Sequence, residues 1–193
     1  MPSTYLGELR VVKIIQIDTS DEESVIAAAK QLQGQPIDVL INNAGIGGRD
    51  DFDKTTKAEM MQQFEVNAVG RILMTRAFLP NLELAVAKSG SVKVAHVSSC
   101  MGSIACNDIG GLYGYRASKV ALNMVNSSLA HDLGNHKIIA LAMSPEYVNT
   151  RMTEHKGQTS PEDSAAGMAN VMAEATLQES GKFYNFTGDR LPW

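Results

Sequence analysis

The sequence predicts an α/β protein in which a doubly wound parallel sheet is covered by helices on both faces, in a three-layer αβα arrangement. Short apolar runs rich in β-branched residues alternate with longer segments of helical periodicity, as in βαβ units. The 193 residues are enough for one domain with a sizeable core, and no repeat or linker divides them. We therefore expect residues 1–193 to form a single domain.

The first predicted strand covers residues 11–17, a mostly β-branched run that is typical of a strand buried on both faces. A helix is predicted to follow it. Ser20 and Glu23 stand three residues apart and match a capping box, and Gly34 stops the helix.

The second strand is predicted over residues 37–41 and the second helix over residues 56–79. Thr56 and Glu59 again match a capping box, and Pro80 ends the helix because proline cannot continue the hydrogen-bond ladder. The rest of the chain repeats the alternation, with strands over 91–98, 137–144 and 183–186 and helices over 115–133 and 160–178.

The composition excludes several classes of partner. A net charge of −4 and an isoelectric point near 5.6, without a basic cluster, predict no nucleic acid and no membrane surface as a partner, which leaves a small molecule or another protein. No apolar run is long enough to cross a bilayer and no secretory leader is visible, so we expect a cytoplasmic protein. Cys100 and Cys106 give no disulfide framework, and neither they nor the four histidines have zinc-ligand spacing, so no metal site is expected.

Four polar motifs follow predicted strands. They are Asn42-Asn43-Ala44-Gly45, Ser99, the pair Tyr115 and Lys119, and a turn that begins at Pro145. In an open α/β sheet the carboxyl ends of the strands form one edge, where ligands bind. The sequence therefore places these residues together at a candidate site.

The residue types at this edge suit acid–base chemistry on a carbonyl group. Tyr115 can act as a general acid if its pKa is lowered, and Lys119, one helical turn away, has the charge to lower it. Ser99 can donate a hydrogen bond to a developing alkoxide. Each residue also has an ordinary explanation, because a Tyr and a Lys four apart are usually surface neighbours and a serine after a strand is usually a cap.

In this order the motifs resemble those of the short-chain dehydrogenase/reductase family, and residues 188–193 resemble the ending of its C-factor and sniffer-like carbonyl reductases. The resemblance implies a Rossmann-like doubly wound fold and an oxidoreductase that transfers hydride between NAD or NADP and a carbonyl or alcohol substrate. It implies Ser99, Tyr115, Lys119 and Asn67 as catalytic residues. In the family, the residue that matches Asn67 bends its helix and holds a water in a proton relay.

The same resemblance implies a set of cofactor contacts. Asp18 matches the residue beside the adenine ring, although an acid at this point is also ordinary before a helix. The remaining contacts are a turn on the ribose side (Asn43, Ala44, Gly45), the two catalytic residues on the nicotinamide ribose (Tyr115, Lys119) and a segment at the carboxamide (Pro145, Val148, Thr150).

Three features depart from the family pattern. Tyr115 follows Ser99 by 16 residues, three more than usual, and glycines in the loop could absorb the difference (Gly110, Gly111, Gly114). Glu146 stands where the family has a glycine, and a positive φ there would cost about 1 kcal/mol. No glycine-rich turn follows an early strand, so we expect an N-terminally truncated fold that lacks two βα units and the segment that binds the cofactor's pyrophosphate.

This departure leaves two alternatives. The chain is either a carbonyl reductase or a catalytically impaired relative that serves as a dimerising or binding module. In both cases the resemblance implies a homodimer or homotetramer interface on the helices over 56–79 and 115–133. In the family's strand order, residues 11–17 would lose their neighbours, so we expect them to pair with residues 37–41 or to be poorly ordered.

Overall fold

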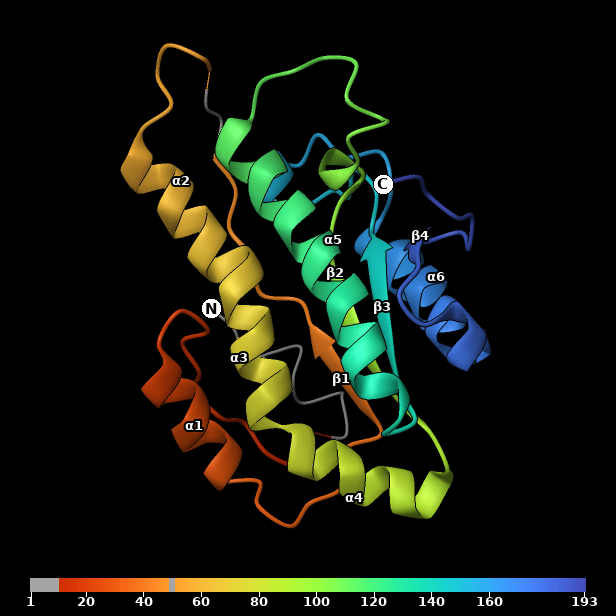
Figure 1. Cartoon of the computed structure of the whole chain (residues 1–193). Coiled ribbons are helices and arrows are strands. Elements are labelled where there is room, and N and C mark those ends of the chain that lie inside the picture. Colours follow the sequence, from red (N-terminus) through yellow and green to blue (C-terminus); the bar gives the residue numbers. More distant parts are fainter. Residues whose placement is uncertain (1–10, 49–50) are drawn as a thin grey trace.

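The computed structural model describes residues 11–48 and 51–193, and this part of the chain contains a four-stranded sheet in the order β1-β2-β3-β4. The strands are Val39–Asn42 (β1), Val92–Val97 (β2), Ile138–Ser144 (β3) and Phe183–Asn185 (β4). Each strand pairs in parallel with the next, so that Val94 of β2 stands between Leu40 and Ala140. The predicted α/β class with a parallel sheet is confirmed (Figure 1).

Helices cover both faces of this sheet (Figure 1). On one face lie α4 (Leu79–Ser89) and α5 (Tyr113–Gly134), with α3 (Gly70–Ala77) against β1 and α1 (Glu22–Lys30) packed on α3. A further helix, α2 (Lys57–Phe64), runs along α5 and joins α3 through a π-helical turn, Glu65–Val69. The other face is covered by α6 (Pro161–Glu174). Short 3-10 turns occupy Cys100–Gly102, Arg151–Thr153 and Leu177–Glu179.

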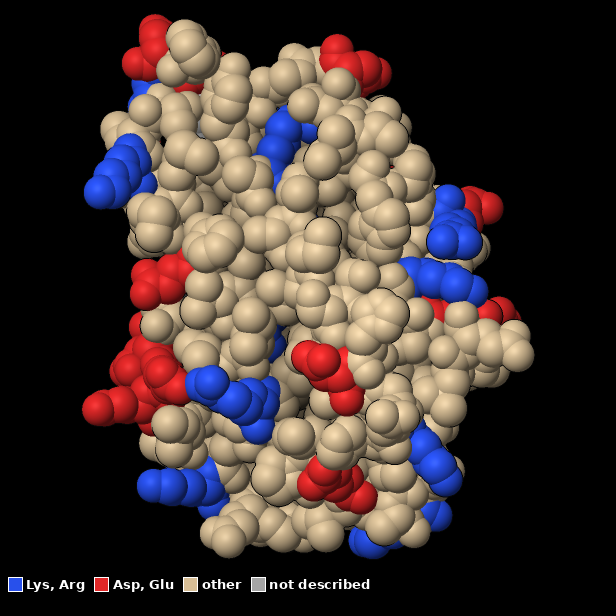
Figure 2. Space-filling view, viewed as in Figure 1, with Lys and Arg blue, Asp and Glu red and all other residues tan. Residues whose placement is uncertain are grey.

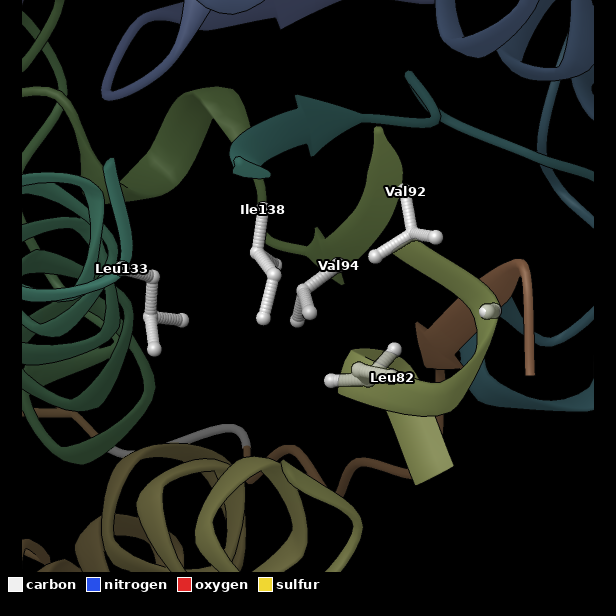
Figure 3. Close-up of a cluster of buried hydrophobic side chains, with 6 residues drawn as sticks. Leu82, Val92, Val94, Leu133 and Ile138 are labelled. Atoms are coloured by element: carbon white, nitrogen blue, oxygen red, sulfur yellow. The ribbon is translucent and has the colours of Figure 1, made fainter. Parts of the chain in front are cut away.

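Two apolar clusters form the core, one on each face of the sheet. Alternate residues of β2 and β3 point to opposite faces because the side-chain period of a strand is two. The first cluster joins the two strands to α4 and α5 (Figure 3): Leu82, Val92, Val94, Leu133 and Ile138. The second joins them to α6: Ala95, Ile139, Leu141, Met143, Met168 and Val171. Every residue of β3 is buried, so this strand anchors both clusters.

Residues 11–17 do not form the predicted strand, and they do not pair with β1. They follow an irregular and largely exposed path, in which Val12 is fully exposed and Ile14 is 71% exposed. Among the described strands, β1 pairs only with β2, and its other edge is open. The predicted strand and its pairing with residues 37–41 are therefore wrong: Ile15 and Ile17 line a cavity together with Ile41 of β1, but the two segments form no backbone pairs.

Two predicted helix ends also differ from the structure. Asp21 rather than Ser20 caps α1, because its carboxylate accepts a hydrogen bond from the Glu23 backbone while the Ser20 hydroxyl donates to Asp18. Pro80 does not end a helix but stands in the first turn of α4, where an N–H would have no helical partner. The predicted capping box at the start of α2 is confirmed.

None of the helices in the described ranges is long and apolar enough to cross a membrane. Within the same ranges, His, Cys, Asp and Glu side chains form no group of three or more that could hold a metal ion. Cys100 and Cys106 are both free thiols.

The contact between Gly70 and the loop before α1 generates a stability prediction. A Cβ at Gly70 would lie 2.5 Å from the Thr19 carbonyl oxygen, so Gly70→Ala should lower the free energy of unfolding by about 1–3 kcal/mol. Gly134→Ala is the matched control, because Gly134 is also helical and a Cβ there meets nothing within 4 Å. Alanine has a higher helix propensity than glycine, so the free energy of unfolding of the control should be unchanged or higher by up to about 1 kcal/mol. Urea denaturation measures both, and equal stability of the two variants would contradict the contact.

Candidate functional site

The candidate site lies at the carboxyl edge of the sheet, where β2 ends and α5 begins. Ser99 follows β2, and its hydroxyl accepts a hydrogen bond of 3.2 Å from the Met101 backbone. The Ser99 hydroxyl also lies close enough to the Tyr115 phenol to influence its pKa. Lys119 stands one turn further along α5, with its Nζ 5.6 Å from the centre of the Tyr115 ring. The structure therefore brings three of the predicted catalytic side chains together.

Tyr115 has a raised pKa. Burial disfavours the phenolate and raises the pKa by more than the nearby Ser99 hydroxyl lowers it, and the proximity of Cys100 raises it further. The prediction that Lys119 lowers the pKa of Tyr115 below its ordinary value is therefore wrong, because burial has the larger effect. The phenol stays protonated near neutral pH, which is the form a general acid requires.

Lys119 is buried, with 4% of its surface exposed. Its Nζ donates a hydrogen bond of 2.8 Å to the Val97 carbonyl at the end of β2. Burial, and after it the nearby charge of Arg71, lower the pKa of Lys119 to about 7. An ammonium group has three donors, and Val97 accepts from one of them. Within the described part of the chain, the other two can serve a ligand.

Asn67 lies fully buried in the π-helical turn between α2 and α3. Its Oδ1 accepts from the Ile46 backbone at 2.9 Å, and its Nδ2 donates to the Ile46 carbonyl at 2.8 Å and to the Ser118 hydroxyl at 3.0 Å. Ser118 in turn donates to the Tyr115 carbonyl at 2.7 Å. The expected irregularity in the helix is this turn. Asn67 connects the segment after β1 to α5, and its part in a water relay stays a prediction.

Asn43, Ala44 and Gly45 follow β1 at the same edge of the sheet. The first two line a cavity of about 230 Å³, together with Thr19 from the segment before α1. Gly45 follows in tight surroundings, because a Cβ there would lie 3.2 Å from Oδ1 of Asn67 and 3.7 Å from Nη2 of the buried Arg71. The ribose-side turn expected from the sequence therefore borders a real cavity.

Asp18 is not brought to this site. The residue is exposed, and its carboxylate accepts hydrogen bonds from the Ser20 hydroxyl at 2.6 Å and the Ser20 backbone at 2.9 Å. These hydrogen bonds lower the pKa of Asp18. Asp18 does not line the cavity, although its neighbour Thr19 does.

Pro145, Val148 and Thr150 follow β3 in a segment that is held by hydrogen bonds to nearby residues. The Pro145 carbonyl accepts from a serine of α6, Val148 is buried and bridges to a neighbouring strand-like segment, and Thr150 caps the 3-10 turn at Arg151–Thr153. Glu146 has a φ of 68°, so the condition for strain at this position is met. Glutamate there occupies the left-handed region that favours glycine, at a cost of about 1 kcal/mol.

The long loop between Ser99 and Tyr115 uses two of its three glycines as expected. Gly110 and Gly111 have φ values of 66° and 65°, which a residue with a side chain rarely adopts. Gly114 does not absorb the extra length, because it lies buried in the first turn of α5.

Two residues of the site were missed by the sequence analysis. Ser118 connects Asn67 to Tyr115, and Arg71 lies 1% exposed between the cavity and Lys119. A signal for Arg71 exists, since it stands four residues after Asn67 and so shares its helix face. Nothing in the sequence distinguishes Ser118 from an ordinary helical serine.

Comparison with known proteins identifies the family of this chain. The model of short chain dehydrogenases matches residues 4–161. The C-signal protein of Myxococcus xanthus is 39% identical over 163 residues, which are 82% of this chain and 93% of that protein. A 1-hydroxy-2-glutathionyl-2-methyl-3-butene dehydrogenase of Rhodococcus sp. is 33% identical over 184 residues, which are 92% of this chain and 78% of that protein.

Solved structures agree with these relatives. The NADPH-bound carbonyl reductase from chicken fatty liver matches with a TM-score of 0.87 at 31% identity, over 94% of this chain and 77% of that one. The carbonyl reductase Sniffer of D. melanogaster matches with a TM-score of 0.88 at 28% identity, over 93% and 77%. Since the family model and the relatives cover most of its length, the chain belongs to the short-chain dehydrogenase/reductase family of oxidoreductases.

Proposed function

We propose that this chain reduces a carbonyl group with NADPH or NADH and that Tyr115 protonates the carbonyl oxygen. The observation that carries the proposal is the grouping of Ser99, the buried Tyr115 phenol and the Lys119 amine, whose Nζ lies 5.6 Å from the centre of the phenol ring. The carbonyl reductases among the structural relatives support the type of reaction. The NADPH in the chicken enzyme supports a nicotinamide cofactor.

The residues of this chain fit such a cofactor at one point in particular. The buried Lys119 ammonium has donors beyond its single hydrogen bond to Val97, and ribose hydroxyls are suitable acceptors. Tyr115 and Lys119 would hold the nicotinamide ribose, while Val148 and Thr150 would hold the carboxamide. The cofactor would supply the hydride, which no side chain can provide.

The side chains then divide the acid–base work. Tyr115 gives its proton to the carbonyl oxygen, and Ser99 donates a hydrogen bond to the same oxygen as negative charge develops there. Lys119 in its protonated form stabilises the remaining phenolate, and a pKa of about 7 lets it lose and regain a proton at neutral pH. Asn67 positions Tyr115 through Ser118.

We further propose that the chain forms a homodimer through α2 and α5. Met61 and Phe64 of α2 and Met124 of α5 are 55%, 42% and 67% exposed. The two helices lie side by side (Figure 1), and the surface between them is largely uncharged (Figure 2). Exposed apolar side chains that gather on one face favour a protein interface. A catalytically impaired protein could use the same face, so this proposal does not depend on activity.

Tyr115→Phe tests the proposed acid. The variant keeps the ring and removes the proton donor, so kcat for carbonyl reduction should fall by about 10²–10⁴-fold, measured as NADPH oxidation with a panel of aldehydes and ketones. Tyr113→Phe is the matched control, because Tyr113 stands on the same helix and is 41% exposed. This variant should reduce carbonyl substrates as fast as the wild type. NADPH oxidation no faster with the wild type than with Tyr115→Phe would defeat the proposal.

Lys119→Met tests the lowered pKa of Lys119 through stability. Between about pH 7 and pH 10.5 the unfolded chain holds a proton on this amine that the folded chain has released, so wild-type stability should rise with pH. Methionine has no such proton. The difference in unfolding free energy, wild type minus variant, should therefore grow with pH by up to about 1.4 kcal/mol per pH unit. Urea denaturation at several pH values measures it, and a difference independent of pH would show that the amine is not perturbed.

Met124→Glu tests the proposed dimer. The wild type should sediment as a dimer and the variant as a monomer, because a carboxylate without a partner is costly to bury in an interface. Leu84→Glu on α4 is the matched control, since Leu84 is 42% exposed but lies outside the α2 and α5 face, and this variant should remain dimeric. A wild type that sediments as a monomer at high micromolar concentration would refute the interface.

A further inference from the structure

Arg71, on α3, carries a buried positive charge that no described neighbouring group neutralises. The residue is 1% exposed, and its Nε and Nη2 atoms are buried without a hydrogen-bond partner in the described part of the chain. Burial lowers the pKa of Arg71 to about 10, so the guanidinium stays charged at neutral pH. An unpaired buried charge is strongly destabilising, and buried polar groups normally have a partner. The arrangement therefore points to a ligand.

The described groups around Arg71 supply no counter-charge. Lys119 and His96 lie near enough for the charge of Arg71 to lower their pKa values. Lys119 is a second basic group, and His96 is neutral because burial and these two neighbours lower its pKa to about 3. The carboxylate of Asp18 belongs to the neighbouring segment, but it is exposed and hydrogen-bonded to Ser20.

Arg71 lines the cavity of about 230 Å³ at the carboxyl end of β1. Among the described residues that line it, Thr19, Asn42 and Asn43 contribute polar groups, the other side chains are apolar, and none is Asp or Glu. The guanidinium reaches directly beneath the turn after β1, with Nη2 3.7 Å from the position that a Cβ on Gly45 would take. Arg71 is thus the charged side chain of the described lining, and the residues around it in the cavity are neutral.

We propose that Arg71 binds a phosphate group of the nicotinamide dinucleotide in this cavity, an inference that rests on the function proposed above. Two N–H donors of a guanidinium match two phosphate oxygens in one plane, and such charge-assisted pairs are strong. The cavity adjoins Asn43 and Gly45 at the strand-end edge where ligands of parallel sheets bind. A bound phosphate supplies the counter-charge that Arg71 lacks.

Arg71→Met tests the assignment by thermal unfolding and calorimetry with three probes: NADPH, inorganic pyrophosphate and reduced nicotinamide riboside. Pyrophosphate should raise the melting temperature of the wild type but not of Arg71→Met. The Kd for NADPH should rise by about 10- to 100-fold in the variant, while binding of the riboside, which has no phosphate, should not change. Arg76→Met is the matched control, because Arg76 stands on the same helix, is exposed and pairs with Glu22, and it should respond to all three probes as the wild type does.

The melting temperature without ligand separates a binding role from a structural one. Arg71→Met removes an unpaired buried charge, so the variant alone should be at least as stable as the wild type. A variant that melts earlier and still responds to pyrophosphate and NADPH as the wild type does would overturn the inference. Arg71→Lys keeps a charge without the planar fork, and an intermediate response to pyrophosphate would support the inference even if Arg71→Met failed to fold.

The three probes also separate this inference from the proposed function. NADPH bound equally by wild type and Arg71→Met, with turnover that depends on Tyr115, would overturn the role of Arg71 and leave the reductase proposal standing. A response to pyrophosphate that depends on Arg71, without any binding of NADPH, would overturn the assignment to a dinucleotide together with the reductase proposal.

Discussion

The amide of Asn67 holds the candidate site together. Its three hydrogen bonds connect the backbone after β1, which continues from Asn43, to Ser118 of α5, the helix that carries Tyr115 and Lys119. The amide reaches both because it lies in the π-helical turn, where the helix from α2 to α3 departs from regular geometry. Such turns are rare and occur often at functional sites. The position of Tyr115 therefore depends on a residue that need not touch the substrate.

Burial without counter-charge governs the electrostatics around this amide. Arg71, His96 and Lys119 stand close together, and the carboxylate nearest in sequence to the cavity, that of Asp18, turns to solvent. His96 remains neutral, and its Nδ1 lies 3.3 Å from the Asn42 amide. At neutral pH Arg71 is therefore fully charged, and Lys119, with a pKa of about 7, is charged in part. A site built in this way favours an anionic ligand and resists a cationic one.

Local signals in the sequence were enough to predict the sheet and most of the helices. Strand β3 is an almost continuous apolar run, β2 is mostly apolar, and the Thr56 capping box marks the start of α2. Local signals failed where a distant partner decides the outcome. Residues 11–17 have strand propensity but do not pair with β1, and Pro80 can end one helix or begin another.

The candidate site shows the same division. The order of Ser99, Tyr115 and Lys119 along the chain was enough to predict that they meet, because parallel strands end at one edge. The raised pKa of Tyr115 and the isolation of Arg71 depend on how deeply each side chain is buried and on what faces it. Neither the depth of burial nor the groups that face a side chain can be predicted from the spacing of residues along the sequence.

The open edge of β1 makes the two halves of the site unequal in rigidity. In a parallel ladder, alternate residues of a strand direct their backbone groups to opposite sides, so some amides of β1 face no described strand, whereas β3 has a partner on each side. Amide protons on the unpaired side of β1 can therefore exchange with solvent through small local openings. Exchange of the β3 amides requires the sheet to open more widely. Ser99 follows β2, which has partners on both sides, and Asn43 follows the strand with one. The residues proposed for proton transfer thus follow strands that are paired on both sides, whereas the residues beside Arg71 follow β1, which is paired on one side among the described strands.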